Sequence, residues 1–268
     1  MTITDIQEIQ NPVKDKLKPI KEKQDIFIPD IINQNISRRN GMVYCLTGSG
    51  GSGKTSLLLN MFKSKNFYRN KFHNIYYICP SASFSSVKNH PFSKHDKVYH
   101  ELTVQLLDEI YNELIAKKEE ATKENEKKEK GVYVDDEEGK SEEEEKEIEY
   151  STIIIDDMAR SLKENAISIQ LNKMIIKARH LCCSFIFTLQ SYYYFPKMLR
   201  KQITYITIFK PKNVEEWNSI AKELFNMNKD DALTVYNYCF NEPYNHIDID
   251  LVSNTFYKNF NLLDLKSH

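Results

Sequence analysis

Four of the seven glycines in this 268-residue chain lie within six positions, between an apolar run and a helical apolar pattern. This loop follows Met42–Leu46, precedes Leu57-Leu58-Leu59 and matches the phosphate-binding pattern G-x-x-x-x-G-K-[ST]. Its glycines let backbone N–H groups surround phosphate oxygens at a helix N-terminus, where the helix dipole favours an anion. We therefore predict a nucleoside triphosphate site formed by Gly48, Ser49, Gly50, Gly51, Ser52, Gly53, Lys54 and Thr55.

Within this loop, two side chains have predicted roles. Lys54 would reach the β- and γ-phosphates, and the Thr55 hydroxyl would bind Mg²⁺. We expect Lys54 to be exposed at the junction of loop and helix. Both roles make ATP with Mg²⁺ the expected cofactor.

A second strand pattern ends in two carboxylates. Three isoleucines in Ile153-Ile154-Ile155 fit a buried parallel strand, and Asp156 and Asp157 follow directly. We expect Asp156 to join the metal shell through water, and Asp157 to polarise the attacking water as a general base.

A third strand pattern, Cys183–Leu189, ends at Gln190, whose amide is predicted to sense or orient the attacking water beside the γ-phosphate. Two of the six arginines flank this strand, Arg179 before it and Arg200 after it. A guanidinium stabilises charge on a transferred phosphoryl group, and either arginine is a candidate for that role from a neighbouring subunit. We expect both near the carboxyl-terminal edge of the sheet.

Strand and helix patterns alternate after residue 40, which predicts an α/β fold with a mostly parallel central sheet flanked by helices. The other expected strands are Met42–Thr47, Asn74–Cys79, Ile203–Phe209 and Ile247–Val252. The expected helices are Lys54–Lys65, Val104–Ala116, Ala166–Arg179, Val214–Phe225 and Asp230–Phe240. We divide the chain into an N-terminal arm, 1–39, and a P-loop ATPase domain, 40–268.

The net charge of −1 conceals an uneven distribution. Residues 117–149 hold 15 acidic residues and 8 lysines, so the rest of the chain carries +6. Because this segment has few apolar residues after Lys123, we expect a solvated, mobile insertion or, alternatively, an acidic docking segment. The basic remainder is compatible with a polyanionic partner. No apolar run approaches the length of a bilayer span, so direct membrane insertion is not expected.

One motif argues for a different class of protein. Asn228-Lys229-Asp230-Asp231 matches the guanine-reading N-K-x-D pattern. It follows an apparent helix end in place of an apolar strand, and no Asp-x-x-Gly occurs at Asp156 or Asp157. We therefore reject a GTPase.

Taken together, these residues resemble the genome-packaging ATPases of large DNA viruses and virophages, the poxvirus-type branch of the FtsK/HerA superfamily. The resemblance rests on Gly48–Thr55, Ile153–Asp157, the run from Ala178-Arg179-His180-Leu181 to Gln190, and Phe195–Gln202, and covers roughly residues 40 to 225. It departs from cellular relatives at Asp157, where they carry Glu, and in its long acidic insertion.

The resemblance implies a RecA-type core and a homo-oligomeric ring that uses ATP to move double-stranded DNA into a capsid. It also implies capsid or portal-vertex partners and a site of action in the host cytoplasm, or association with the virion. Two alternatives stay open: a P-loop helicase or recombination ATPase, and a nucleotide-gated capsid scaffold that does not translocate DNA.

Overall fold

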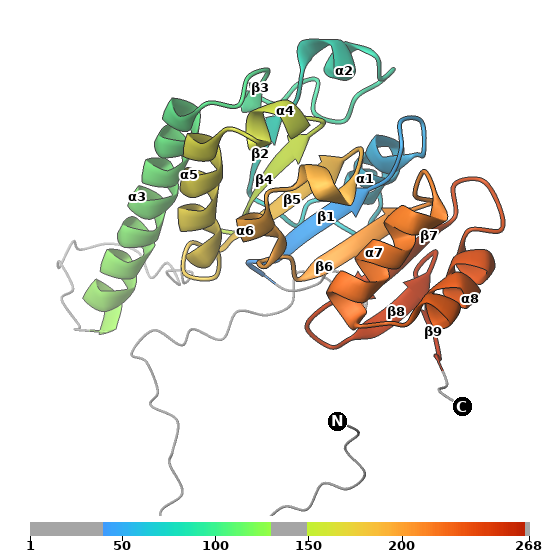
Figure 1. Ribbon diagram of the computed structural model, residues 1–268. Helices are drawn as coiled ribbons and strands as arrows, with labels where there is room; N and C mark the ends of the chain where they lie inside the picture. The colour runs from blue at the N-terminus through green and yellow to red at the C-terminus, as the bar shows by residue number, and fades with distance from the viewer. Residues whose placement is uncertain (1–39, 130–148, 266–268) are drawn as a thin grey trace, which may run out of the picture.

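A computed structural model describes residues 40–129 and 149–265 of the chain (Figure 1). The predicted N-terminal arm and residues 130–148 of the predicted insertion lie outside the described residues. The described residues form one nine-stranded sheet flanked by helices.

The sheet has the strand order β3-β2-β4-β5-β1-β6-β7-β8-β9. Pairing is parallel from β3 to β6 and antiparallel from β6 to β9. The strands are β1 (Val43–Thr47), β2 (Asn74–Ile78), β3 (Val98–Tyr99), β4 (Ser151–Asp156), β5 (Cys183–Leu189), β6 (Tyr205–Phe209), β7 (His246–Asp250), β8 (Thr255–Lys258) and β9 (Asn261–Leu263). A mostly parallel sheet is the predicted fold class.

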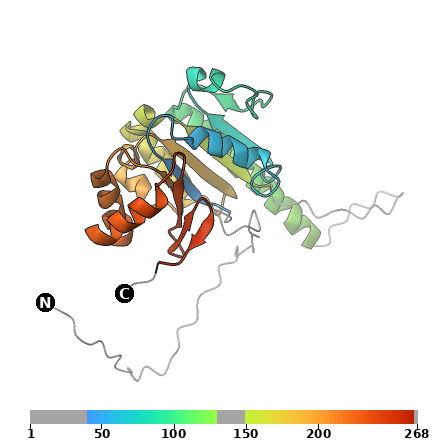
Figure 2. The same cartoon turned by 90° about the vertical axis from the view of Figure 1, so that its right-hand side faces the viewer.

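Helices cover both faces of the sheet (Figures 1 and 2). The α-helices are α1 (Lys54–Lys63), α2 (Ser81–Ser85), α3 (Val104–Glu129), α4 (Ala159–Leu162), α5 (Asn165–Ile176), α6 (Lys197–Arg200), α7 (Val214–Phe225) and α8 (Lys229–Cys239), with a short 3₁₀ helix at Tyr192–Tyr194. One buried cluster joins α1 to the sheet, and a larger one joins α3, α5, α7 and α8 to the opposite face.

The alternation of side chains along the strands explains these two clusters. In β1, Tyr44 and Leu46 pack with α1, whereas Val43 and Cys45 belong to the larger cluster. Every residue of β1, β4 and β5 is buried, as expected for central strands covered on both faces. Because β4, β5 and β1 pair in parallel, their carboxyl ends meet at one edge of the sheet.

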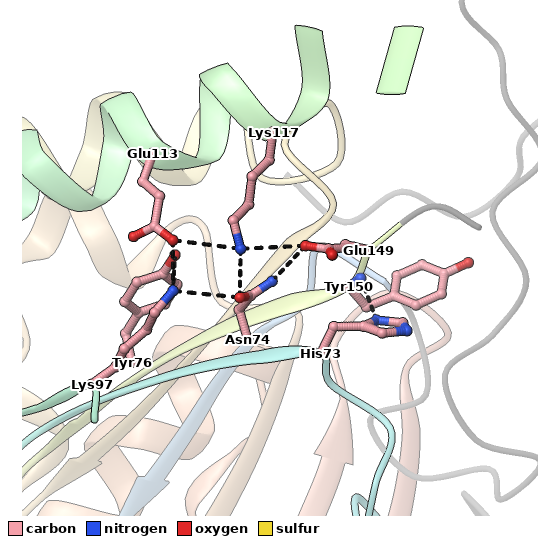
Figure 3. Close-up of polar contacts among 8 residues, drawn as sticks. All are labelled: His73, Asn74, Tyr76, Lys97, Glu113, Lys117, Glu149 and Tyr150. Carbon is pink, nitrogen blue, oxygen red and sulfur yellow. Dashed lines mark hydrogen bonds and ion pairs between the residues drawn. The ribbon is translucent and has the colours of Figure 1, made fainter. Parts of the chain in front are cut away.

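A polar network ties α3 to the starts of β2 and β4 (Figure 3). The Lys117 ammonium donates to Asn74 Oδ1 at 2.6 Å and lies 3.3 Å from Glu149 Oε2, while Asn74 Nδ2 donates to Glu149 at 2.9 Å. The hydrogen bond from Asn74 and the Lys117 ammonium hold the pKa of Glu149 below its ordinary value, against the effect of partial burial. The two ends of the predicted insertion thus contact each other, and α3 continues past Lys117 to Glu129.

Within residues 40–129 and 149–265, none of the helices combines the length and the apolar character that a membrane span requires.

Candidate active site

The phosphate-binding loop connects β1 to α1, as the glycine pattern predicts. Gly53 caps α1 with φ 101°, in the left-handed region that favours glycine. A Cβ on Gly48 would lie 2.6 Å from Phe209 Cβ, so the close approach of β6 requires glycine there. The loop therefore occupies the carboxyl end of β1, with the N-terminus of α1 directed into it.

Lys54 is folded back into this loop. Its ammonium donates to the carbonyl oxygens of Gly48 at 2.7 Å and Ser49 at 2.9 Å. The residue is only 9% exposed, so the expectation of an exposed lysine is wrong, because the loop carbonyls close around the side chain. Burial lowers the pKa of Lys54, and the carboxylates of Asp157 and Asp156 oppose that shift. The loop thus holds the Lys54 ammonium where the phosphate oxygens of a bound nucleotide would compete with the loop carbonyls for it.

Asp156 ends β4 and lies beside the loop. The Thr55 hydroxyl donates to its Oδ1 at 3.2 Å, Thr188 of β5 donates to the same oxygen, and the Tyr77 hydroxyl of β2 donates to Oδ2 at 2.6 Å. Burial and the Asp156 carboxylate raise the pKa of Tyr77 well above its ordinary value, so its hydroxyl remains a donor. Asp156 is therefore a buried carboxylate that three hydroxyl groups orient.

The Thr55 hydroxyl and the Asp156 carboxylate fit Mg²⁺, which prefers oxygen ligands. No cluster of three or more His, Cys, Asp or Glu that could hold a metal occurs in the described parts of the chain. Mg²⁺ typically uses one or two carboxylates together with substrate phosphates. Thr55 and Asp156 would hold the ion.

Asp157 and Gln190 meet at the same edge of the sheet. Gln190 Nε2 donates to Asp157 Oδ1 at 3.1 Å, and both side chains are exposed. Asp157 has φ 56°, and its backbone N–H donates to the Thr188 hydroxyl at 3.0 Å. Because the backbone turns at Asp157, the two consecutive carboxylates point in different directions. That of Asp156 is buried at the edge of the sheet, and that of Asp157 contacts Gln190. The arrangement can orient a water molecule. The role of Asp157 as general base and that of Gln190 in orienting the water stay predictions.

Replacing the two aspartates by asparagine should have different effects. Asp156→Asn should weaken Mg²⁺-dependent nucleotide binding as well as turnover, whereas Asp157→Asn should bind ATP normally and hydrolyse it about 100-fold more slowly, or worse. Asparagine tolerates the left-handed backbone at position 157, so this variant changes charge without strain. Isothermal titration with an ATP analogue and single-turnover kinetics separate the two effects. Equal losses of binding would contradict the division of roles.

Arg179 lies at the opposite edge of the sheet from the loop. A Cβ on Gly41, just before β1, would lie 2.8 Å from the Arg179 backbone nitrogen. The expectation that Arg179 lies near the carboxyl-terminal edge of the sheet is therefore wrong. After β4 the chain runs back along α5 to the opposite edge, and Arg179 lies there, shortly before the start of β5. Its side chain is exposed, and its proposed action on a neighbouring subunit stays a prediction.

Arg200 ends α6, shortly before β6 begins, and its side chain is engaged within the chain. Its Nη1 lies 3.0 Å from Glu223 Oε2, and its guanidinium carbon lies 5.1 Å from the ring centroids of Tyr192 and Tyr193. To act on a neighbour, this side chain would have to leave Glu223. Its role also stays a prediction.

Three residues near the site were not singled out from the sequence. Tyr77 and Thr188 bond Asp156, and exposed Arg160 lines a cavity of about 520 Å³ together with Asp157. The position of Arg160 three residues after Asp157 is a signal that sequence reasoning could have used. Tyr77 and Thr188 give no such signal, since their strands look like ordinary buried strands.

The N-K-x-D match has a structural explanation. Asn228 caps α8: its Oδ1 accepts from the Asp231 backbone N–H at 2.9 Å, and its Nδ2 donates to Asp231 Oδ2 at 2.6 Å. This is a capping interaction, which favours Asn before a helix and Asp in its first turn. The geometry agrees with the rejection of a GTPase.

The fold and the loop together define the class of P-loop NTPases. Within that class, the sequence profile of the poxvirus A32 protein family matches residues 33–259, and the chain belongs to this family. The resemblance to the poxvirus-type branch of packaging ATPases is thereby confirmed. No curated protein sequence matches the chain.

Solved structures with similar folds are ATPases of several kinds. B204, the DNA-packaging ATPase from Sulfolobus turreted icosahedral virus, has a TM-score of 0.52 and 17% identity, over 82% of this chain and 97% of B204. EssC (ATPases 2 and 3) from Geobacillus thermodenitrificans has a TM-score of 0.54 and 13% identity, over 85% of this chain and 41% of EssC. Thermomonospora curvata EccC (ATPases 2 and 3) has a TM-score of 0.51 and 12% identity, over 84% of this chain and 37% of EccC. These likenesses confirm the predicted fold class.

Proposed function

We propose that this protein is an ATPase that moves double-stranded DNA into a viral capsid. The observation that carries the proposal is the site itself: Lys54, Asp156, Asp157 and Gln190 meet at one sheet edge in a member of the poxvirus A32 family. The fold shared with B204, a DNA-packaging ATPase, supports the same conclusion.

The chain's own residues would perform hydrolysis in a defined order. The loop N–H groups and Lys54 bind the phosphates. Thr55 and Asp156 would hold the Mg²⁺ that accompanies the nucleotide. Mg²⁺, when bound, neutralises charge on the phosphate oxygens. Gln190 orients a water molecule whose oxygen attacks the γ-phosphorus, while Asp157 accepts its proton. The bond from the γ-phosphorus to the bridging oxygen breaks, which releases ADP and phosphate.

DNA, a ring and a capsid complete the proposal. Outside residues 117–149 the chain carries +6, which favours a polyanion such as the DNA backbone. We propose a homo-oligomeric ring around the duplex, contacts with capsid or portal-vertex proteins, and action in the host cytoplasm of a virophage-like virus.

The purified protein should hydrolyse ATP faster when duplex DNA is added. A DNA translocase couples ATP hydrolysis to movement along DNA, so bound duplex should raise its kcat. We expect stimulation of at least about tenfold, which is smaller than the effect of groups supplied in trans to other phosphoryl-transfer enzymes. Steady-state turnover with and without a blunt duplex measures it, and the same assay at rising salt should lose the stimulation.

Two results would contradict this proposal. Nucleotide binding with no turnover, with or without DNA, would favour a nucleotide-gated scaffold. Separation of a labelled duplex into single strands during hydrolysis would favour a helicase.

A further inference from the structure

We propose that Tyr77 is a positioning residue for the Mg²⁺ site: its hydroxyl sets the orientation of the Asp156 carboxylate so that the other oxygen faces Thr55. This inference rests on the proposed function, since it concerns the same nucleotide site. It adds a residue from β2, a strand that carries none of the motifs of the site.

The two oxygens of Asp156 have different partners. Oδ2 accepts from the Tyr77 hydroxyl at 2.6 Å, whereas Oδ1 accepts from Thr188 and, at 3.2 Å, from Thr55 in the first turn of α1. The strand register explains the approach: Tyr77 pairs with Ile154, so both point to the sheet face that carries Asp156 two residues later. Tyr77 therefore fixes the carboxylate from the side opposite the loop.

Tyr77 is itself held in place and shielded from water. Its ring centroid lies 4.9 Å from that of Phe92 and 5.1 Å from that of His90, both in the segment between β2 and β3. Tyr77 and Asp156 are each 1% exposed. Water cannot readily replace the hydroxyl, so its removal would leave Asp156 Oδ2 without its donor and the carboxylate held only through Oδ1, by Thr188 and Thr55.

The test is Tyr77→Phe, with binding of a fluorescent ADP analogue measured with and without Mg²⁺. The factor by which Mg²⁺ tightens binding should fall by about tenfold or more, as for other groups that orient metal ligands. The Mg²⁺ concentration for half-maximal ATP hydrolysis should rise in parallel. Binding without Mg²⁺ should stay close to that of the unmodified protein, because Tyr77 does not line the phosphate loop.

Tyr76→Phe is the matched control. Tyr76 is the neighbouring residue of β2, fully buried on the sheet face opposite α1, and its hydroxyl accepts from the Lys97 ammonium at 3.3 Å. It should leave the Mg²⁺ factor unchanged. A thermal melt of each variant checks that both remain folded.

A double-mutant cycle separates positioning from a structural role. In an Asp156→Asn background, Tyr77→Phe should have no further effect on the Mg²⁺ factor if Tyr77 acts through Asp156. An unchanged Mg²⁺ factor in Tyr77→Phe, whatever its thermal stability, would overturn this inference. An unmodified protein whose nucleotide binding is not tightened by Mg²⁺ would overturn the inference as well, whereas failure to bind nucleotide with or without Mg²⁺ would overturn the proposed function.

Discussion

Replacing Lys54 with alanine should abolish ATP hydrolysis, lowering kcat by about 1000-fold or more, because a preorganised cation at the transferring phosphate supplies several kcal/mol of transition-state stabilisation. The Lys54 ammonium already lies inside the loop, 2.7 Å from the Gly48 carbonyl oxygen, so little movement separates it from bound phosphate. Turnover of the purified variant, measured beside its ADP affinity, tests this directly.

Because Lys54 is buried, the variant needs a check of its fold. Lys63→Ala is the matched control: it removes the same charge from the exposed last turn of α1 and should leave kcat unchanged. Unchanged kcat in a folded Lys54→Ala protein would end the ATPase proposal.

Two inactive variants should regain hydrolysis when their subunits are mixed, if an arginine acts across a subunit interface. An arginine-to-alanine subunit should bind ATP and lose about 1000-fold or more in DNA-stimulated turnover. Mixed with Lys54→Ala subunits, it should recover part of that activity, since an intact loop then meets an intact arginine. Arg179 and Arg200 are the arginines that the sequence predicted, and Arg160, exposed beside Asp157, is the one that the structure adds.

The arginine that complements identifies the residue that acts in trans. Co-purification of differently tagged subunits shows that mixed assemblies form. If none of the three arginine variants complements although mixed assemblies form, the ring with a trans-acting arginine is refuted.

Local patterns were sufficient to predict the principal elements of the fold. The strand at Cys183–Leu189 and the helix at Val214–Phe225 have the bounds predicted for them. Both have strong patterns: a continuous apolar run, and a helical stripe preceded by a capping Asn. The short strands β3, β8 and β9 were not predicted, because a strand of two to four residues is too short to show an alternation of apolar and polar side chains.

The sequence by itself determined the phosphate loop, the acid-tipped strand and the alternation that leads to a parallel sheet, because each is a pattern of adjacent residues. Only the tertiary structure decided that Tyr77 bonds Asp156, that Thr188 links Asp156 to Asp157, and that Arg179 lies at the far edge. Tyr77 and Asp156 are 79 positions apart. Such contacts depend on the order and register of the strands, which arise from packing of the whole sheet and leave no trace in any local stretch of sequence.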